Sequence, residues 1–511
     1  MIVDIREARR ALSATSPLKL SYQASIYPTD YFPWKEAEGD DEKSTVFTKS
    51  SKALGIYNAH DCVVTARVWQ GIQAEPEWNT PRVQQLYEHQ SGLAQVAAEM
   101  HSTGIRIDRG MRKWMAWALL EEYQEKERKF LKAVGIKGFE CQPNHFRALI
   151  FQRHARKKYE HLARFNLEDP LDPSMYVDPR EMETISVDED ALTLLLIDPS
   201  TPDELKALIQ LYWDAQEVWK ARSTFVVSKK ISHAIGPDGR LRAGWNSCGT
   251  DTGRFSCKDP NVMNIEKQLR SMYCASKGGV LVGADRMQFE LRIMYAVTGD
   301  EALGAGIRAG NVYVEEAKDY FDLPKHLKKA DIKPDAYKST KNIRLAKQYG
   351  AGKKKVFQMM LKQDRACTYQ KSLLLGEAFE RRNARTVAWW AEETERVLKC
   401  GYSETRVLQR RRVYPAEPER TDTANYPIQG SAADIKNLWM LDVHAALQKH
   451  SMKSKLIIDL HDALYTDGPK SEAATVQRIM EDTAATEYEI QGMKYVFPVE
   501  CQRHFRWGDF T

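Results

Sequence analysis

The sequence predicts an α+β protein, and three kinds of stretch support that prediction. Residues 279–292 read GVLVGADRMQFELR, an apolar run bounded by glycine that favours a buried strand, followed by apolar positions at helical spacing. Residues 455–464 read KLIIDLHDAL, a second apolar run interrupted by two polar residues. Residues 83–103 form a long amphipathic helical pattern, and residues 108–230 read as charged helices. Strands among long helices indicate a mixed fold.

Each predicted strand ends on a carboxylate. Asp285 follows the first apolar run, and Asp462 follows the second. Two carboxylates far apart in sequence could meet across a sheet and bind two Mg²⁺ ions, since Mg²⁺ prefers oxygen ligands and completes its shell with waters and substrate phosphates. Such a pair of ions stabilises the attacking and the leaving oxygen of phosphoryl transfer. Asp285 taken alone is also typical of a helix N-cap.

Residues 339–352 read STKNIRLAKQYGAG and carry three notable side chains at spacings of four. On a helix, Lys341, Leu345 and Tyr349 would share one face. A cation, an apolar group and an aromatic ring in line suit a nucleoside triphosphate, because they can meet its phosphates, sugar and base in turn. The alternative is a basic amphipathic helix without a ligand.

These stretches and two others resemble the motifs of DNA polymerases of family A, the polymerase I-like enzymes, in the compact form that many phages encode. DRMQFELR (285–292) resembles the palm motif DYSQxELR, and HDA (461–463) resembles the HDE motif. A lysine followed eight residues later by Tyr-Gly (341–350) resembles the fingers motif. TDTGRFSCKDPNVMNI (250–265) resembles TGRLSSxDPNLQNI, and NYPIQGSAADIKNLWM (425–440) resembles NxPIQGTAADIxKxAM.

The resemblance implies a right-hand polymerase fold, with an antiparallel palm sheet, helical fingers and a helical thumb, preceded by a partial 3′–5′ exonuclease-like region. The expected division is 1–80 for the exonuclease-like remnant, 81–235 for the thumb and its connecting helices, 236–300 for the first part of the palm, 301–400 for the fingers with the nucleotide-binding helix near 338–350, and 401–511 for the second part of the palm. From Lys126 to Arg164, eleven Lys and Arg accompany three Glu, which suits a thumb that grips duplex phosphates. A solvated helical surface is the alternative for each lysine.

The resemblance also implies the catalytic groups. Asp285 and Asp462 would hold two Mg²⁺ ions, for which Mn²⁺ can substitute, together with the backbone carbonyl of Arg286. Lys341 would place a compact ammonium donor at the phosphates and the leaving pyrophosphate. Positioning and charge would then supply most of the acceleration.

The implied nucleotide site comprises Gln288, Glu290, Tyr313, Lys341, Leu345 and Tyr349. Glu290 matches the family's steric gate, which together with Tyr349 closes the space that a ribose 2′-OH would need and so favours deoxynucleotides. A structural salt bridge is the alternative for Glu290. Leu345 stands where family members carry Phe or Tyr, and this predicts strong discrimination against dideoxynucleotides.

Several positions depart from the family pattern. Tyr337 replaces the Arg that usually precedes the catalytic Lys by four residues, which leaves the γ-phosphate without its forked partner. Lys338 and Arg344 are candidates to compensate. Asn311-Val312-Tyr313 replaces the DIH that often follows the first palm motif, although Tyr313 could still donate a hydrogen bond. Ala463 replaces the glutamate of HDE.

The implied contacts to DNA are Arg254, Asn264, Arg270, Arg411, Asn425, Gln429 and His461. Arg254 would reach the minor groove at the primer terminus, where acceptors occupy similar positions in every correct base pair. A purely structural role is the alternative for Arg270, and a charged surface run is the alternative for Arg411 and its arginine neighbours. Pro427 argues that the helix after Asn425 begins only at the proline.

The N-terminal stretch resembles the exonuclease domain at one motif only. Tyr57 and Asp61 match the family's YxxxD, in which the tyrosine orients a water and the aspartate binds metal, but the earlier DxE is missing. Proofreading by this chain alone is therefore not expected. A separate exonuclease polypeptide could pair with the sheet edge left by such a truncation, and a processivity factor is a further possible partner.

Composition excludes several other classes of protein. The 511 residues carry a net charge of +5, and the eight cysteines form no CxxC pair, which argues against a zinc ribbon or a disulfide framework. The apolar runs fall short of the ~20 residues of a membrane span, and the N-terminus MIVDIREARR lacks the apolar region of a secretory signal. We therefore expect no membrane partner and a cytoplasmic location.

Together these features predict template-directed 5′→3′ DNA synthesis from dNTPs on primer-template DNA, by two-metal-ion nucleotidyl transfer. A single-subunit RNA polymerase shares the palm, but Glu290 and the run QGSAAD (429–434) argue against it. A non-catalytic DNA-binding or assembly subunit is the other alternative. Tyr337, Asn311 and the missing exonuclease half support it, yet both aspartates and Lys341 remain.

Overall fold

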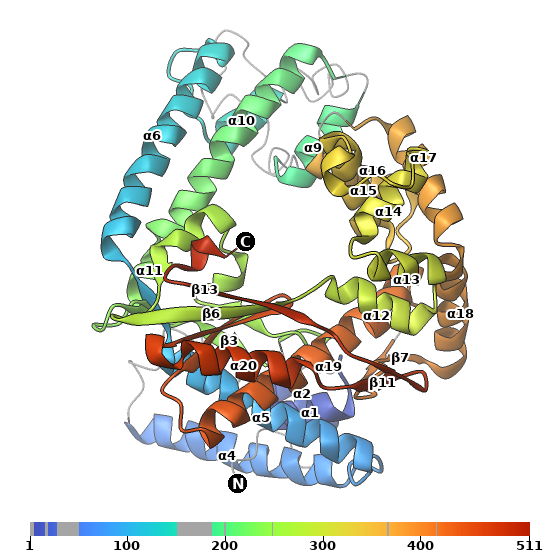
Figure 1. Ribbon diagram of the computed structural model, residues 1–511. Helices are drawn as coiled ribbons and strands as arrows, with labels where there is room; N and C mark the ends of the chain where they lie inside the picture. The colour runs from blue at the N-terminus through green and yellow to red at the C-terminus, as the bar shows by residue number, and fades with distance from the viewer. Residues whose placement is uncertain are drawn as a thin grey trace.

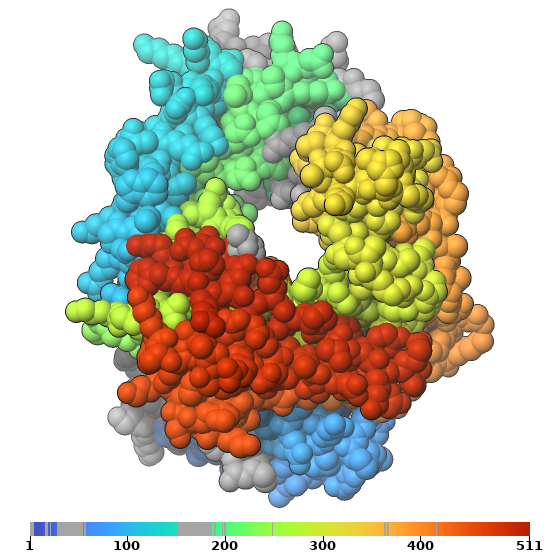
Figure 2. Space-filling model, in the orientation of Figure 1, coloured from blue at the N-terminus to red at the C-terminus, as the bar shows by residue number. Residues whose placement is uncertain are grey.

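The fold is that of a computed structural model, which describes residues 5–15, 19–27, 51–150, 187–198, 201–247, 249–364, 367–414 and 416–510. A sheet crosses the middle of the molecule and forms the floor of a central hollow, and two helical walls rise from it on opposite sides (Figure 1). The space-filling view is hollowed at its centre, between these walls and the floor (Figure 2). The predicted α+β class is confirmed.

The floor is a four-stranded antiparallel sheet in the order β13-β6-β10-β9. Its strands are β6 (Gly279–Arg286), β9 (Lys455–Leu460), β10 (Ala463–Pro469) and β13 (Val499–His504). Both apolar runs that the sequence marked as strands are therefore strands of one sheet. The strand β10 lies between them, because it pairs with β6 on one side and with β9, at the edge of the sheet, on the other.

Three helices cover one face of this sheet: α5 (Pro81–Thr103), α19 (Arg420–Lys449) and α20 (Ala473–Ala484). Val282, Ala284 and Leu464 of the sheet pack there against Trp439 of α19 in one buried cluster. Leu281, next to Val282, points to the opposite face, as strand alternation requires, and joins a second cluster. The sheet is thus held between two cores.

One wall consists of the long helices α6 (Arg109–Val134) and α10 (Asp203–Ala221), which pack side by side. Asp108 caps α6 by accepting a hydrogen bond from the Met111 N–H at 3.0 Å, and Gly135 ends the helix in the left-handed conformation that glycine tolerates. The remaining helices of this side are α7 (Pro143–Ile150), α9 (Glu189–Ile197) and α11 (Lys229–Ala234). At the far end α9 contacts α16 of the opposite wall (Figure 1).

Part of the basic excess predicted for this wall is neutralised. Lys126 pairs with Glu122 at 2.9 Å, and Lys129 pairs with Glu125 at 2.8 Å, each one helical turn apart. Residues 151–164 of the same stretch lie outside the described residues.

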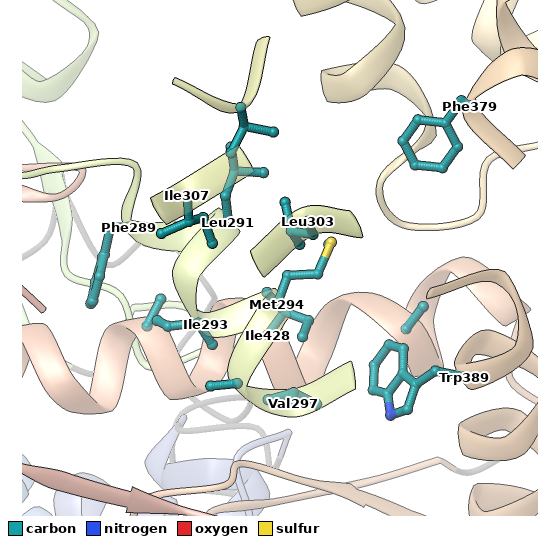
Figure 3. Close-up of a cluster of buried hydrophobic side chains, with 14 of the residues drawn as sticks. Phe289, Leu291, Ile293, Met294, Val297, Leu303, Ile307, Phe379, Trp389 and Ile428 are labelled. Atoms are coloured by element: carbon teal, nitrogen blue, oxygen red, sulfur yellow. The ribbon is translucent and has the colours of Figure 1, made fainter. Parts of the chain in front are cut away.

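The other wall is a cluster of helices: α12 (Phe289–Thr298), α13 (Glu301–Arg308), α14 (Val312–Tyr320), α15 (Pro334–Lys347), α16 (Lys353–Gln363), α17 (Tyr369–Arg382) and α18 (Ala384–Cys400). Their apolar side chains meet in one core with α19 (Figure 3), to which Phe289, Leu291, Ile293, Met294, Val297, Leu303, Ile307, Phe379, Trp389 and Ile428 belong. Arg344 of α15 is fully buried in this wall, where it pairs with Glu316 and donates to Asn383. The expectation that Arg344 could compensate at the γ-phosphate is therefore wrong, because its guanidinium is held inside the wall.

Short strands complete the molecule. The pairs and the small sheet that they form are β2-β1-β5 (Arg240–Leu241, Ile105–Ile107, Tyr273–Cys274), β3-β4 (Gly244–Asn246, Ser256–Lys258), β7-β8 (Tyr402–Glu404, Arg411–Val413) and β11-β12 (Tyr488–Ile490, Met493–Tyr495). Within the described parts of the chain, no helix is long and apolar enough to span a membrane.

The described residues before Pro81 form three helices, α1 (Ile5–Leu12), α2 (Leu20–Ile26) and α4 (Ser51–Gln73), and no strand. They share a buried cluster with α5. The described N-terminal region thus offers no sheet edge for a separate exonuclease polypeptide to pair with, contrary to expectation. Tyr57 and Asp61 both lie in α4; Asp61 is half-buried, and the Tyr57 side chain is outside the described set.

Candidate active site

The structure brings the two predicted carboxylates together at one end of the central strands. Asp285 of β6 lies directly opposite Ala463 of β10, and Asp462 immediately precedes Ala463. The Arg286 N–H donates to the Asp462 backbone carbonyl at 3.3 Å. Two acids 177 positions apart in the chain therefore lie at one end of the sheet, Asp285 on β6 and Asp462 in the loop immediately before β10.

A tight turn presents Asp462. Leu460 pairs with Ala463, so His461 and Asp462 are the two residues of the β9–β10 hairpin loop. His461 has φ 52°, in the left-handed region that two-residue hairpins require and that histidine adopts more readily than most residues. His461 is exposed, whereas Asp462 is half-buried.

The surroundings of both acids disfavour their charged forms. Burial raises the pKa of Asp462 to about 7, with Glu290 and Asp285 adding to the increase and Arg254 and Lys436 opposing it. Burial likewise raises the pKa of Asp285, and the charge of Glu500, its direct neighbour on β13, raises this pKa further. Around the two aspartates, the acidic side chains raise the pKa values more than the nearby cations lower them. Carboxylate oxygens in such surroundings are the ligands that a hard divalent cation prefers.

These acids alone do not form a complete metal cage. Among the described residues, no group of three or more His, Cys, Asp and Glu side chains is arranged to hold a metal ion. Two neighbouring carboxylates fit Mg²⁺ nevertheless, since this ion is usually held by one or two carboxylates with substrate phosphates and water as its other ligands. The Arg286 side chain is buried and donates to the Phe497 carbonyl. Since a guanidinium has no acceptor atom, the backbone carbonyl of Arg286 is the candidate ligand.

Glu290, in the first turn of α12, joins the sheet to the helical wall. Arg254 Nη2 donates to one of its carboxylate oxygens, and the Tyr349 hydroxyl donates to the other at 2.6 Å. Gln348 Nε2 lies 3.4 Å from the same second oxygen. Burial, together with Glu290, raises the pKa of Tyr349 well above its ordinary value, so the hydroxyl remains a donor. The salt bridge that was the alternative for Glu290 is present, and the role of Glu290 as a gate stays a prediction.

The helix α15 carries two of the three residues that were predicted to face a nucleotide. It begins at Pro334, four residues before the expected start, and its α-helical part ends at Lys347. Lys341 and Leu345 are exposed on one side of α15, and Tyr349 follows in the turn that reaches Glu290. Lys338 is also exposed and stays a candidate cation beside them.

Two of the departures from the family pattern contact each other. Asn311 Nδ2 donates to the Tyr337 hydroxyl at 3.4 Å. The ring of Tyr313 meets the ring of Tyr337 edge-on at 6.1 Å between centroids. Tyr337 and Asn311 therefore belong to one local rearrangement rather than to two separate losses.

Gln288 stabilises the same region from the other side. Its Nε2 donates to the Gly310 carbonyl at 2.8 Å, and its Oε1 accepts from the Val312 N–H at 3.4 Å. Gln288 adopts φ 49°, at the point where β6 ends and α12 begins. The side chain thus links the start of α12 to the segment before α14.

The predicted DNA-contacting residues divide into two groups. Asn264 is exposed and lines a cavity of about 650 Å³, whose lining also includes Arg147 of α7 and Lys220 of α10. Asn425 and Gln429 are half-buried in α19, where a spacing of four places them on one side. Arg254 contacts Glu290, and His461 lies near Arg254, so these two residues lie beside the acidic site.

The expectation that α19 begins only at Pro427 is wrong. The helix runs without interruption from Arg420 to Lys449. Residues on both sides of the proline are buried, and packing of these residues holds the helix through the position that lacks an N–H.

Arg270 and Arg411 are held by structural contacts. Arg270 Nε donates to the Ile265 carbonyl at 3.0 Å, and its guanidinium lies over the Trp507 ring at 4.8 Å. Arg411 Nε donates to Glu404 at 3.1 Å. This guanidinium also lies 3.5 Å from a carboxylate oxygen of Glu77 and 4.5 Å from the Tyr402 ring centroid. The contacts of Arg270 agree with its structural alternative, and those of Arg411 hold it against neighbouring carboxylates. Contact of either residue with DNA stays a prediction.

Sequence reasoning missed three charged residues beside the site. Glu500 of β13 lies directly opposite Asp285 of β6. Lys436 of α19 pairs with Asp459 of β9, two residues before His461 of the hairpin loop. Asp459 is fully buried, and its Oδ1 has no hydrogen-bond partner among the described residues. The available signal was weak: a charged residue inside the apolar run KLIIDL and a lysine inside a buried helix.

Comparison with known proteins identifies the family. The sequence model described as DNA polymerase family A matches residues 161–509, more than half of the chain. The chain belongs to DNA polymerase family A. This agrees with the five motifs, all of which lie inside the matched range, and with the right-hand fold that they imply.

Relatives within family A are distant. The thermostable DNA polymerase I of Thermus aquaticus is 24% identical over an alignment of 446 positions, which covers 83% of this chain and 48% of that protein. DNA polymerase I of Chloroflexus aurantiacus is 25% identical over an alignment of 463 positions, which covers 84% of this chain and 44% of that protein. The chain therefore spans about half the length of these curated relatives.

A solved structure supports the fold. The POL domain of Pol1 from M. smegmatis, in complex with DNA primer-template and dNTP, superposes with a TM-score of 0.74 at 19% identity. The alignment covers 99% of this chain and 82% of that one. The likeness shows the overall fold of a polymerase domain, and the assignment of the α6–α10 wall, the sheet floor and the α12–α18 wall to thumb, palm and fingers stays a prediction. The compact phage form stays a prediction.

Proposed function

We propose that the chain is a DNA-directed DNA polymerase that extends a primer 5′→3′ from dNTPs. The observation that carries this proposal is the meeting of Asp285 and Asp462 at the ends of adjacent strands, within a family A chain. The neighbouring Pol1 domain was solved with primer-template DNA and dNTP, which supports the same ligands here. The central hollow between thumb and fingers supplies the space for them (Figure 2).

In this proposal the acids form the metal site. Asp285, Asp462 and the backbone carbonyl of Arg286 would bind two Mg²⁺ ions, which when bound lower the pKa of the primer 3′-OH and neutralise the leaving pyrophosphate. Mn²⁺ would serve in their place. The raised pKa values of both aspartates without a cation support this assignment, because a divalent charge removes the reason for holding a proton.

The chain's own side chains bind and orient the nucleotide. Lys341, exposed on α15, would hold the phosphates and donate a proton to pyrophosphate, while Leu345 packs against the sugar. Glu290, fixed between Arg254 and Tyr349, would occupy the space of a 2′-OH. Gln288 and Tyr313 would complete the pocket at its outer end. Asn264, Asn425, Gln429 and His461 are the proposed DNA contacts.

Proofreading is not part of the proposal. Tyr57 and Asp61 share α4, but the sequence supplies no DxE partner for them. The described N-terminal residues include no strand, so they provide no sheet edge to which a separate exonuclease polypeptide could pair.

Primer extension by the wild type and by Asp462→Asn tests the proposal, with Asp482→Asn as a matched control on the exposed face of α20. We expect extension by the wild type and the control and none by Asp462→Asn, while all three bind duplex DNA equally. Absence of extension by the wild type, with duplex binding retained, would instead favour the non-catalytic subunit that the joint change at Tyr337 and Asn311 suggests. Preference for rNTPs over dNTPs would favour an RNA polymerase.

A further inference from the structure

The N-terminal helix α1 carries a buried carboxylate that the proposed mechanism does not use. Glu7 is only 1% exposed, although it sits in a short charged helix, IREARRAL. The Ser247 hydroxyl donates to its Oε1 at 2.6 Å, across 240 positions of sequence. A buried carboxylate needs such partners, because leaving it unpaired costs several kcal/mol, on the order of the whole stability of a domain.

A chain of polar contacts leads from Glu7 toward the palm. In the orientation of Gln90 that satisfies both its neighbours, its Nε2 donates to Glu7 Oε2 at 3.3 Å and its Oε1 accepts from Arg410 Nη1 at 2.8 Å. Arg410 is itself buried, and its Nη2 donates to Asp434 of α19 at 3.0 Å. Arg410 thus lies between α19 and a carboxylate supplied by the first helix of the chain.

The guanidinium of Arg410 lies directly against Gly253. A Cβ at Gly253 would be 2.2 Å from Arg410 Nη1, so only glycine fits, and its φ of +80° also favours glycine. Asn437 Nδ2 fixes the Gly253 carbonyl at 2.9 Å. The next residue is Arg254, which holds Glu290. Arg410 therefore packs directly against Gly253, in the turn that leads into Arg254.

Other contacts of the α1 segment reach the same two places. Arg10 lies 3.5 Å from Asp251 in the loop before Gly253. The Ala14 N–H donates to the Arg411 carbonyl at 2.9 Å, and the Thr15 hydroxyl donates to the Val413 carbonyl at 3.3 Å. Residues 5–15 thus touch both the loop that leads to Arg254 and the strand that follows Arg410.

We propose that α1 is a working part of the polymerase centre and that Glu7 is a positioning residue, which acts through Gln90 and Arg410 to set Arg254 against Glu290. The inference rests on the proposed function, and it adds a specificity role to a segment outside the 161–509 family match. Loss of Glu7 would let Arg410 shift and so loosen the Arg254–Glu290 contact, which lowers discrimination against the ribose 2′-OH.

The test compares dNTP with rNTP incorporation by the full chain on one primer-template. We expect Glu7→Ala to lower the ratio of kcat/KM for dNTP to that for rNTP by about tenfold, and Glu7→Gln, which keeps the acceptor for Ser247, to retain most of it. Arg410→Lys keeps the positive charge but loses the forked guanidinium, and it should lower this ratio by a similar factor. The double variant Glu7→Ala/Arg410→Lys should have the same ratio as either single variant. Glu88→Gln, which removes an exposed carboxylate from the adjacent helix α5, is the matched control.

A merely structural role of Glu7 predicts a different result: both incorporation rates fall together and their ratio stays at the wild-type value, which would overturn the proposal. If Glu7→Ala does not fold, Ser247→Ala removes one hydroxyl from the same contact, and an unchanged ratio in that folded variant would overturn the proposal as well. Failure of the wild type to extend a primer would refute the proposed function itself, a separate outcome.

Discussion

The buried pair Lys436–Asp459 gives a stability prediction that the structure allows us to work out. Both side chains are almost completely buried, at 3% and 0% exposure, and they join α19 to β9 just below the hairpin loop. The Lys436 ammonium also lies 5.4 Å from the Phe255 ring centroid. Burial raises the pKa of Asp459, and Lys436 acts in the opposite direction.

The single variant Lys436→Met and the double variant Lys436→Met/Asp459→Val should change the stability in opposite directions. Lys436→Met leaves Asp459 buried without its cation, and removal of one partner from a buried pair destabilises by about 3–5 kcal/mol. Lys436→Met/Asp459→Val removes both charges, and such replacements are neutral or stabilise by roughly 1–4 kcal/mol. The unpartnered Asp459 Oδ1 favours the stabilising end of that range, since its desolvation is not compensated.

Urea unfolding at pH 7, followed by tryptophan fluorescence, measures these differences, because Trp439 lies on the same helix as Lys436. Lys449→Met, at an exposed position of α19, controls for loss of a lysine from that helix. The reasoning is refuted if Lys436→Met unfolds at the wild-type midpoint, or if the double variant is as unstable as the single one.

Three further predictions concern pH and substrate choice. Burial and the nearby Arg410 lower the pKa of His89 to about 3, so the unfolded chain takes up this proton first as the pH falls below 6.5. Wild-type stability should therefore drop by about 2 kcal/mol more than that of His89→Leu between pH 7 and pH 5 in urea titrations. If the free energy of unfolding changes equally with pH in the wild type and in His89→Leu, the burial of a neutral His89 is contradicted. Leu345→Tyr adds a hydroxyl at a 42% exposed position without overpacking, and should raise the ddNTP-to-dNTP incorporation ratio by roughly tenfold or more; efficient termination by the wild type at equal concentrations would refute the role of Leu345. Glu290→Ala opens the proposed gate and should raise rNTP incorporation relative to dNTP by roughly tenfold to a hundredfold, whereas an unchanged ratio would assign Glu290 to the salt bridge alone.

The sequence allowed local features to be predicted well. The apolar runs of β6 and β9 mark strands because each is bounded by turn residues, and the acids at their ends follow from that placement. The spacing of four predicts that Lys341 and Leu345 share one face of α15, because helix geometry is local, whereas Tyr349 lies beyond the end of the helix. In each case the signal lies within about ten residues, the range over which periodicity is informative.

Long-range contacts escaped prediction. Glu7 reads as one charge in a basic helix, and nothing near it in sequence indicates Ser247 or Arg410 as its neighbours. Arg411 reads as part of a basic run free to bind phosphate, yet Glu404 and Glu77 neutralise it from other elements. Tertiary packing also overrode a local rule at Pro427, where the helix continues. These features depend on which segments meet, and the sequence pattern carries no record of that.

The number of Mn²⁺ ions bound with primer-template and dNTP tests the central claim most directly. A dideoxy-terminated primer prevents turnover, and electron paramagnetic resonance then counts the bound ions in the wild type and in Asp462→Asn. The account predicts two tightly bound ions in the wild type and fewer in the variant, because Asp285 and Asp462 share them. Equal numbers in both proteins, or no bound ion in a wild type that holds DNA and nucleotide, would contradict it.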